Sequence, residues 1–264
     1  MKSFPKQKKG TQAITLKRSF HFLNEIDLDD INVDKKILHK NLNQKIWDDF
    51  EIKEDVRKKL IEISNQFYGF LDIKVKPTNI LFTGSLANYN YSEFSDIDVH
   101  LEVDYSKISE DHELVNEFFF TKSTLWELKH DIKVNGFPVQ LFVQDISKES
   151  RKSSGIFSLT KDEWIQKPSY ENFEVDTETL KRKIKKFVDK IELLDINKIT
   201  PEKLYAHAKK LKDEINRMRQ SGLDANGEYS LENLAFKYLR NNKYIDRLKD
   251  LISKSFDKIY SLNN

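Results

Sequence analysis

The sequence contains no cysteine, and this absence excludes disulfide bonds, thiolate zinc sites and cysteine nucleophiles. No apolar run approaches the roughly 18 residues of a membrane span, and no hydrophobic segment follows the basic N-terminus MKSFPKQKKG. The six histidines are scattered without ligand spacing, so no zinc site is expected. These absences predict an intracellular, cytoplasmic protein that does not enter a membrane.

The composition sets only wide bounds on the fold. The 264 residues can form one large domain or two small ones. Hydrophobic residues make up 38% of the chain and charged residues 33%, so a modest core and a well-solvated surface are both available. The formal net charge of +2 indicates no particular partner. Without an internal repeat, the fold class has to come from local patterns.

The N-terminal part predicts an extended arm followed by helical structure. Apolar residues nearly alternate between 14 and 22, as in an extended arm, and an acidic loop follows at 27–34. The pattern becomes helical from Leu38 and is clearest at 51–71, where apolar residues recur at helical spacing (Val56, Leu60, Ile63, Phe67 and Leu71). A turn at 76–79 leads into a short strand at 80–83.

The middle of the chain predicts strands beside a helix. A helix is expected at 109–129, and Asn135-Gly136 is a hairpin signal between strands at 131–134 and 137–143. Residues 151–170 contain short turns and no strong period. Strands and a hairpin beside helices predict an α+β domain with an antiparallel or mixed sheet.

From residue 176 the composition shifts to helix formers. This shift predicts a small helical domain at 176–264 after a first domain at 1–175. Thr200 and Pro201 indicate a helix start, and Gly222 indicates a helix end. Ser230 is expected to cap a further helical region that continues to about residue 260.

The stretch ILFTGSLANYNYSEFSDIDVHLE, residues 80–102, carries the strongest functional pattern. Side chains alternate along a strand, so Asp96 and Asp98 share one face with their Cα atoms about 6.5–7 Å apart. Two carboxylates at this spacing suit a pair of bridged hard cations. Gly84 lets the backbone approach a ligand closely, while the Ser85 hydroxyl and the start of a short helix offer donors to a phosphate.

Each half of this pattern has an ordinary alternative. Gly-Ser turns mostly bind nothing, and a lone Asp-x-Asp is more often a solvated strand face than a metal site. The combination of an apolar strand, Gly-Ser, a ten-residue link and an Asp-x-Asp strand favours a metal–nucleotide site. His100 shares the face of Asp98, and a histidine that simply fills this strand face is the simpler interpretation.

With Gly84-Ser85 followed by Ser95-Asp96-Ile97-Asp98-Val99, the sequence resembles the DNA polymerase β-type nucleotidyltransferase superfamily, and most closely a phage-type branch. Residues 136–145, residues 155–164 and the segment GLDANGEYSLENLAFKYLR extend the resemblance over most of the chain. The resemblance implies a palm-like, mixed-sheet domain followed by a small helical domain. It also implies two Mg²⁺ ions on Asp96 and Asp98, with β- and γ-phosphates held by Gly84 and Ser85.

The superfamily uses a third carboxylate on a neighbouring strand, and this sequence has Gln140 at the matching place within GFPVQLFV. Glutamine is nearly isosteric with glutamate but neutral, so it cannot act as a base, and Asp145 has the opposite strand parity. Either a glutamate was replaced to trap substrate, or the chain is a natural variant with weakened or lost turnover. The intact remainder of the motif slightly favours the first, and both predict better binding of Mg-nucleotide than turnover.

The helical domain offers two candidate contact surfaces. Residues 177–220 contain 13 Lys/Arg and 7 Asp/Glu, which fits a solvated helix face about as well as contact with an RNA or DNA backbone or with the triphosphate itself. Asn233, Lys237 and Arg240 share one helix face. In related two-domain transferases the helical domain closes over the nucleotide, so Lys237 is the first candidate for a triphosphate ligand. An ordinary exposed polar face is the equal alternative.

These patterns predict a Mg²⁺-dependent enzyme that transfers a nucleoside monophosphate from an NTP, with ATP expected first, to a hydroxyl acceptor. The basic helical domain marginally favours an RNA 3′ end over a protein side chain, a second nucleotide or a small molecule. The alternative is an NTP-binding regulatory or antitoxin-like pseudoenzyme, for which Gln140 is the best support. A purely structural module would require both motifs to be accidental.

Overall fold

A computed structural model of the chain describes residues 28–31, 39–147, 155–170, 175–194 and 198–262. The described residues divide into two compact units: the 34–174 unit, of which residues 39–147 and 155–170 are described, and a second unit of residues 28–31, 175–194 and 198–262. The arm expected at 14–22 lies outside the described residues. Of the loop expected at 27–34, only residues 28–31 are described, and they include the short 3₁₀ helix η2 (Leu28–Asp30).

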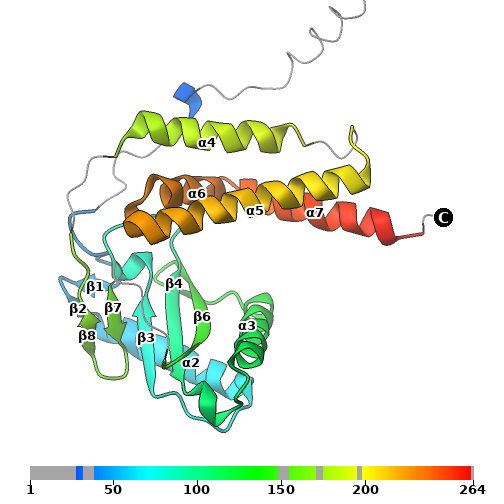
Figure 1. Ribbon diagram of the computed structural model, residues 1–264. Helices are drawn as coiled ribbons and strands as arrows, with labels where there is room; N and C mark the ends of the chain where they lie inside the picture. Colours follow the sequence, from blue (N-terminus) through cyan, green and yellow to red (C-terminus); the bar gives the residue numbers. More distant parts are fainter. Residues whose placement is uncertain (1–27, 32–38, 148–154, 171–174, 195–197, 263–264) are drawn as a thin grey trace, which may run out of the picture. The chain divides into compact units, whose positions relative to one another are not determined.

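A mixed six-stranded sheet forms the centre of the 34–174 unit, in the order β5-β6-β4-β3-β7-β8. Figure 1 shows the strands from β6 to β8. Its strands are β3 (Asn79–Thr83), β4 (Ile97–Val103), β5 (Lys133–Val134), β6 (Phe137–Asp145), β7 (Ile156–Ser158) and β8 (Glu163–Gln166). Strands β4 and β6 pair in parallel, and helix α3 (His112–Lys129) makes the crossover that a parallel pair requires. The sheet and its helices confirm the predicted α+β class.

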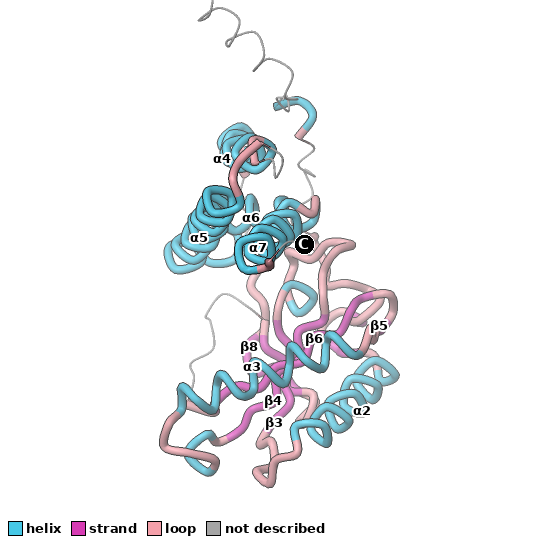
Figure 2. Tube along the Cα trace, turned by 90° about the vertical axis from the view of Figure 1, so that its right-hand side faces the viewer, coloured by secondary structure: helices cyan, strands magenta, loops and turns pink. Residues whose placement is uncertain are grey.

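Strand β4 has one fully buried face and one half-buried face. The buried side chains pack in one core with α2 (Glu54–Leu71) and α3, which both lie along the sheet (Figure 2). They are Ile97, Val99, Leu101 and Val103. The half-buried face, which we call the site face, carries alternate residues of β4 and β6 because the two strands run in register. These residues are Asp98, His100, Glu102, Gln140, Phe142 and Gln144.

The structure differs from the helical prediction before residue 54. A two-stranded hairpin, β1 (Trp47–Asp48) and β2 (Glu51–Ile52), occupies this place, and the helix predicted from residue 51 begins at Glu54. Asp49 has a φ of 51° in the two-residue turn of the hairpin. The apolar residues before residue 54, such as Trp47 and Ile52, are buried in the core beneath the sheet, and the hairpin buries them without forming a helix.

A second hairpin lies where the sequence shows no period. Strand β7 pairs with both β3 and β8. Trp164 of β8 donates its indole N–H to the carbonyl oxygen of Phe50 at 2.6 Å and stacks on Trp47 with 4.6 Å between ring centroids. By contrast, the predicted Asn135-Gly136 hairpin is confirmed, and both of its turn residues have positive φ.

The second unit contains four described α-helices after residue 175: α4 (Thr177–Glu192), α5 (Pro201–Asn226), α6 (Leu231–Asn241) and α7 (Tyr244–Tyr260). The predicted helix end at Gly222 is wrong, because α5 continues to Asn226 and stops at Gly227, which has a φ of 67°. Gly222 instead makes room for α6, since a Cβ there would lie 2.5 Å from the Cβ of Glu232. Ser230 caps α6 as predicted, accepting the N–H of Asn233.

Lys243, with a φ of 65°, separates α6 from α7 within the region predicted to be continuously helical. In the ranges that the structure describes, no helix has both the length and the apolar character needed to cross a bilayer.

Candidate functional site

The two aspartates of the Asp-x-Asp motif lie at the start of β4. Asp98 is inside the strand, where it pairs with Thr83 of β3 on one side and with Gln140 of β6 on the other. Asp96 precedes the first strand residue, Ile97, although the sequence pattern predicts that it lies within the strand. Both side chains are half-buried, so a ligand can reach them while neighbouring groups restrict their movement.

Gly84 brings the backbone directly against the carboxylate of Asp98. It follows the last residue of β3 with a φ of 80° and a ψ of −164°, a conformation that is essentially restricted to glycine. A Cβ at this position would overlap Oδ2 of Asp98 and lie 2.9 Å from its Cγ. The glycine that the sequence pattern assigns to ligand approach is therefore also required by the neighbouring acid.

The hydroxyl of Ser85 is held by a second serine at the start of the 3₁₀ helix η3 (Ser85–Ala87). Ser95 Oγ lies 2.7 Å from Ser85 Oγ and accepts the backbone N–H of Ser92 at 2.9 Å. Either serine can donate the hydrogen of this bond; when Ser95 donates it, the Ser85 hydrogen is left for a ligand. Buried Ser95 therefore orients the hydroxyl that the sequence pattern assigns to phosphate.

Contacts from outside the motif hold η3 in place, and the sequence pattern does not reveal them. The indole N–H of Trp47 donates to the carbonyl oxygen of Leu86 at 2.8 Å, and both residues are fully buried. Thr83 Oγ1 donates to the carbonyl oxygen of Gly155 at 3.1 Å. A Cβ at Gly155 would overlap the carbonyl oxygen of Ala87. The β1–β2 hairpin and the segment before β7 thus fix the Gly-Ser turn against the sheet.

Gln140 lies directly beside Asp98 in the parallel ladder of β4 and β6, on the site face. Its side chain is half-buried. Asp145 lies at the other end of β6, opposite Val103. There its carboxylate accepts the Ser147 hydroxyl at 2.7 Å and contacts His112 Nδ1 at 3.0 Å. These contacts make Asp145 a structural residue that is remote from the Asp-x-Asp motif.

Replacing Asp145 with asparagine is expected to lower the free energy of unfolding by about 1–3 kcal/mol at neutral pH, because a buried acceptor network loses its charge. Burial alone would raise the pKa of Asp145, but the hydrogen bonds from Ser147 and Tyr105 and the nearby His112 outweigh it and keep the pKa below the ordinary value of 3.8. The charged Asp145 carboxylate therefore stabilises the fold fully above pH 3.8, and this stabilisation is lost as the pH falls through the lowered pKa.

Denaturant unfolding of wild-type protein and the Asp145→Asn variant between pH 3 and pH 8 would measure this difference. Asp131→Asn is the matched control, because Asp131 is exposed and pairs only with Lys133 among the described residues, at 3.0 Å. We expect the control to change stability by no more than about 0.5 kcal/mol. An Asp145→Asn cost that persists unchanged at the acid end would contradict the assignment.

Glu127 of α3 is a carboxylate close to the motif that the sequence pattern does not identify. Partial burial raises the pKa of Glu127, and the negative charge of Asp96 raises it further. Within the described residues, no group of three or more His, Asp and Glu side chains has the arrangement of a metal site. Glu127 therefore adds negative charge near Asp96 without completing a set of three ligands.

The three nucleotide ligands predicted in the helical unit all lie on α6. Lys237 and Arg240 are half-buried. Asn233 is buried, with its Nδ2 donating to the carbonyl oxygen of Glu228 at 2.7 Å and its Oδ1 accepting from Arg219 Nε at 3.3 Å. These bonds tie the start of α6 to α5 and favour a structural role for Asn233 over the nucleotide contact that its helix face predicts.

Several lysines of the basic helical stretch are engaged in ion pairs between helices. Lys183 pairs with Glu232 of α6 at 2.7 Å. Lys186 and Lys190 contact Glu214 of α5 at 3.3 Å and 2.9 Å, and hydrogen bonds from Lys190 and then Lys186 lower the pKa of Glu214 despite its partial burial. For these three lysines the contacts favour a role in helix packing over contact with a nucleic-acid backbone.

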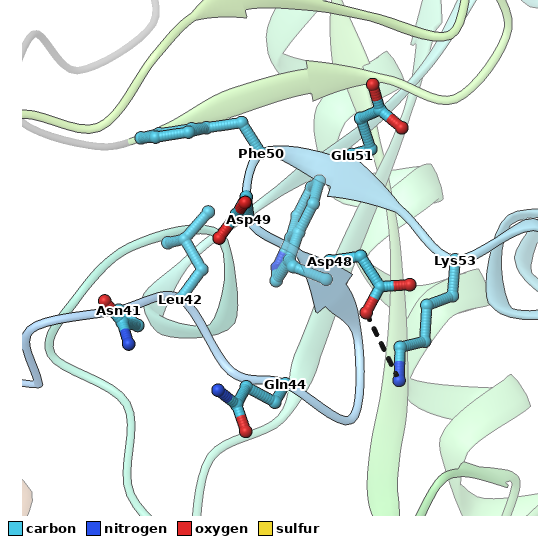
Figure 3. Close-up of a pocket in the computed structure, with 9 residues that line it drawn as sticks. Asn41, Leu42, Gln44, Asp48, Asp49, Phe50, Glu51 and Lys53 are labelled. Atoms are coloured by element: carbon cyan, nitrogen blue, oxygen red, sulfur yellow. Dashed lines mark ion pairs between the residues drawn. The ribbon is translucent and has the colours of Figure 1, made fainter.

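A cavity of about 790 Å³ lies beside the β1–β2 hairpin, and its described lining includes no residue of the Gly-Ser or Asp-x-Asp motifs (Figure 3). Asp48, Asp49 and Glu51 line this cavity, while Lys53 contacts Asp48 at 3.8 Å. Three carboxylates against one lysine would repel the phosphates of a nucleotide. We therefore place the candidate nucleotide site at the Asp-x-Asp motif and not in the larger cavity.

A scan against protein-family models and searches of curated proteins and solved structures gave no match to the chain. The functional conclusion therefore rests on the residues themselves and on their geometry.

Proposed function

We propose that the chain is a nucleotidyltransferase with a palm-like sheet, which moves a nucleoside monophosphate from a Mg-NTP to a hydroxyl acceptor, preferably an RNA 3′ end. The observation that carries this proposal is the packing of Gly84 against Asp98, beside a Ser85 hydroxyl that Ser95 orients. A close backbone turn with an oriented hydroxyl suits phosphate, and two adjacent carboxylates suit a hard cation. Both features occur at the same end of the sheet.

The two aspartates fit Mg²⁺ without a complete cage of protein ligands. Proteins commonly bind Mg²⁺ through one or two carboxylates together with substrate phosphates. Asp96 and Asp98 are both half-buried, and Asp98 packs against the Gly84 turn, so the two aspartates can supply such a pair. When bound there, Mg²⁺ would neutralise charge on the triphosphate and favour loss of the proton from the acceptor hydroxyl.

The chain's own groups would position the triphosphate and the acceptor. The Gly84 turn lets phosphate oxygens approach the backbone, and the Ser85 hydroxyl donates a hydrogen bond to one of them. Gln140, beside Asp98, can donate or accept a hydrogen bond at the acceptor hydroxyl but cannot remove its proton. We therefore expect this sequence to bind Mg-NTP well and to turn it over slowly.

Thermal unfolding with and without Mg²⁺ and NTP tests the binding half of the proposal. At a Mg-NTP concentration of 100 times Kd, the expected stabilisation is about 2.7 kcal/mol, a rise in Tm of several degrees. Asp96→Asn and Asp98→Asn should lose the Mg²⁺-dependent part of this rise. Glu102→Gln, on the same face of β4 but about 13 Å from Asp98, should keep it. An equal rise in all four proteins would contradict the assignment of the aspartates.

A second candidate function is that of an NTP-binding regulatory protein without turnover, which the neutral Gln140 favours. Incubation with labelled NTPs and mixed acceptors separates the two functions, since a transferase releases pyrophosphate and labels an acceptor. Tight Mg-NTP binding with no pyrophosphate release, even in the Gln140→Glu variant, would support the regulatory function. Label that appears only on protein would exclude the RNA 3′ end as the acceptor.

A further inference from the structure

A second, smaller cavity of about 230 Å³ lies between α3 and the site face. Its walls come from β4, β6 and one face of α3, and they include His100, Asn116, Phe120, Ser123, Phe142 and Gln144. The α3 residues at 116, 120 and 123 recur at helical spacing, and Glu127 is the next position of that stripe. Because α3 follows the end of β4 and leads back to the start of the parallel strand β6, the stripe runs toward the ends of these strands that carry Asp98 and Gln140.

The register of β4 and β6 places this cavity next to the proposed reaction centre. Asp98 pairs with Gln140, and the next pair on the same face is His100 with Phe142, which lines the cavity. Two residues along a strand correspond to about 6.6 Å. The cavity thus begins one side-chain pair away from Asp98, within reach of the remainder of a nucleoside whose hydroxyl lies at Asp98.

The sheet order separates the cavity from the phosphate-binding turn. Gly84 and Ser85 follow β3, on one side of β4, whereas the cavity lies toward β6 and α3 on the other side. A triphosphate held at Gly84 therefore approaches the aspartates from the β3 side. The group that lies in the cavity approaches them from the opposite side, where an attacking hydroxyl would come from.

The lining of the cavity suits a flat, uncharged, polar ring. Phe120 lines the cavity and is 69% exposed although it is a large apolar side chain, and the ring centroids of two other lining residues, His100 and Phe142, lie 5.0 Å apart. Asn116 and Gln144 offer amide groups; one N–H of Gln144 already donates to Glu102 at 3.3 Å, which leaves its oxygen and second hydrogen. The described lining residues include no lysine or arginine. Aromatic faces that stack on bases, with amides that bond their edges, are the usual means of reading unpaired nucleotides.

We propose that this cavity binds the base of the acceptor nucleoside, stacked on Phe120 and Phe142, and so places its hydroxyl at Asp98. This assignment rests on the proposed transferase function and narrows the acceptor to a nucleotide or a nucleic-acid 3′ end. Phe120 supplies the exposed stacking face, and the amides of Asn116 and Gln144 bond the edge of the base. The donor NTP lies on the other side, with its phosphates at Gly84 and Ser85.

Binding of a fluorescent five-nucleotide RNA with a free 3′-hydroxyl, in the presence of Mg²⁺ and a non-hydrolysable NTP, tests the proposal by anisotropy. Phe120→Ala should weaken RNA binding about 5- to 150-fold, the loss expected when one base loses its aromatic stacking partner. Phe118→Ala is the matched control, because Phe118 is 41% exposed on the same helix and does not line the cavity. Phe120→Trp, which keeps an aromatic face, should restore most of the affinity.

The remaining measurements separate this proposal from the proposed function. The Tm rise with Mg-NTP should be the same in wild-type, Phe120→Ala and Phe118→Ala proteins. A free nucleoside monophosphate that competes with the RNA at equal concentration supports a nucleotide acceptor, whereas competition by longer RNA alone supports a 3′ end. Equal RNA affinity of the Phe120→Ala and Phe118→Ala variants, or a Phe120→Ala variant that loses only the Mg-NTP effect, overturns the acceptor assignment. If Mg-NTP does not raise the Tm of the wild-type protein, the proposed transferase function is refuted. If RNA binding still depends on Phe120 in that case, the cavity binds a base but not as the acceptor of a transfer reaction.

Discussion

Replacing Gln140 with glutamate is expected to raise the rate of nucleotidyl transfer by about 100-fold or more, the usual contribution of a positioned general base. The reason is the pairing of Gln140 with Asp98 on the site face, which places a new carboxylate next to the proposed Mg²⁺ ligands. Glutamate has nearly the shape of glutamine but can take a proton and bind a cation. The measurement is the release of pyrophosphate from a labelled NTP in the presence of RNA.

A second Gln→Glu substitution tests whether the gain in rate depends on the position of the new carboxylate or only on the added negative charge. Gln66 is exposed on α2, so Gln66→Glu adds one carboxylate away from the site and should leave the transfer rate unchanged. Binding of Mg-NTP, followed by the rise in Tm, should be at least as strong in Gln140→Glu as in wild-type protein. If Gln140→Glu binds Mg-NTP and still shows no gain in nucleotide incorporation, Gln140 does not occupy the place of a third acid.

The parts of this site that could be predicted from the sequence are those in which apolar and polar residues alternate regularly or a turn signal is present. The alternation of β4 gives the face of Asp98, the alternation of β6 gives the face of Gln140, and the Asn135-Gly136 turn indicates the hairpin that opens β6. Parity alone does not give register, since a shift of two residues keeps every side chain on its face. The pairing of Asp98 with Gln140 therefore comes from the structure.

Other parts of the site depend on contacts between segments that are distant in the sequence. Trp47 lies in a strand of two residues, too short for a periodic signal, and its partner Leu86 is 39 residues away. Strands β7 and β8 are likewise short, and the pairing of β7 with β3 and of β8 with β7 comes from tertiary packing. Glu127 follows an ordinary helical pattern, and only the packing of α3 beside the sheet brings its carboxyl group near Asp96.

In the helical unit the pattern predicted the helix correctly, while the contacts of one of its residues, Asn233, favour a different role from the predicted one. The spacing of Asn233, Lys237 and Arg240 places them on one helix, and α6 contains all three. The pattern carries no information about the Arg219 guanidinium, which reaches the Asn233 amide from α5. The prediction of a helix end at Gly222 is wrong for a related reason. The missing side chain allows α6 to pack closely against α5, and the backbone of Gly222 remains helical.

Replacing Gly84 with alanine is expected to lower both the stability of the fold and the affinity for Mg-NTP, because alanine would strain the backbone and also displace the Asp98 carboxylate. Its φ of 80° with ψ of −164° is strained for any other residue, at about 1–3 kcal/mol of unfolding free energy. The new Cβ would also overlap the Asp98 carboxylate, which must then move from its place beside the turn. By analogy with changes that displace metal ligands, we expect Mg-NTP affinity to fall about 10- to 100-fold.

Alanine substitutions at two other glycines separate the effect of backbone strain from the effect of the overlap with Asp98. Gly136 has a φ of 91°, and a methyl group added there would meet no described atom within 4 Å, so Gly136→Ala should lose about 1–2 kcal/mol of stability and keep Mg-NTP binding. Gly69 lies within α2 with open space around it, so Gly69→Ala should gain up to about 1 kcal/mol. Thermal unfolding of the three variants with and without Mg-NTP measures both effects. If Gly84→Ala loses stability only as Gly136→Ala does and binds Mg-NTP normally, the contact between Gly84 and Asp98 has no part in nucleotide binding.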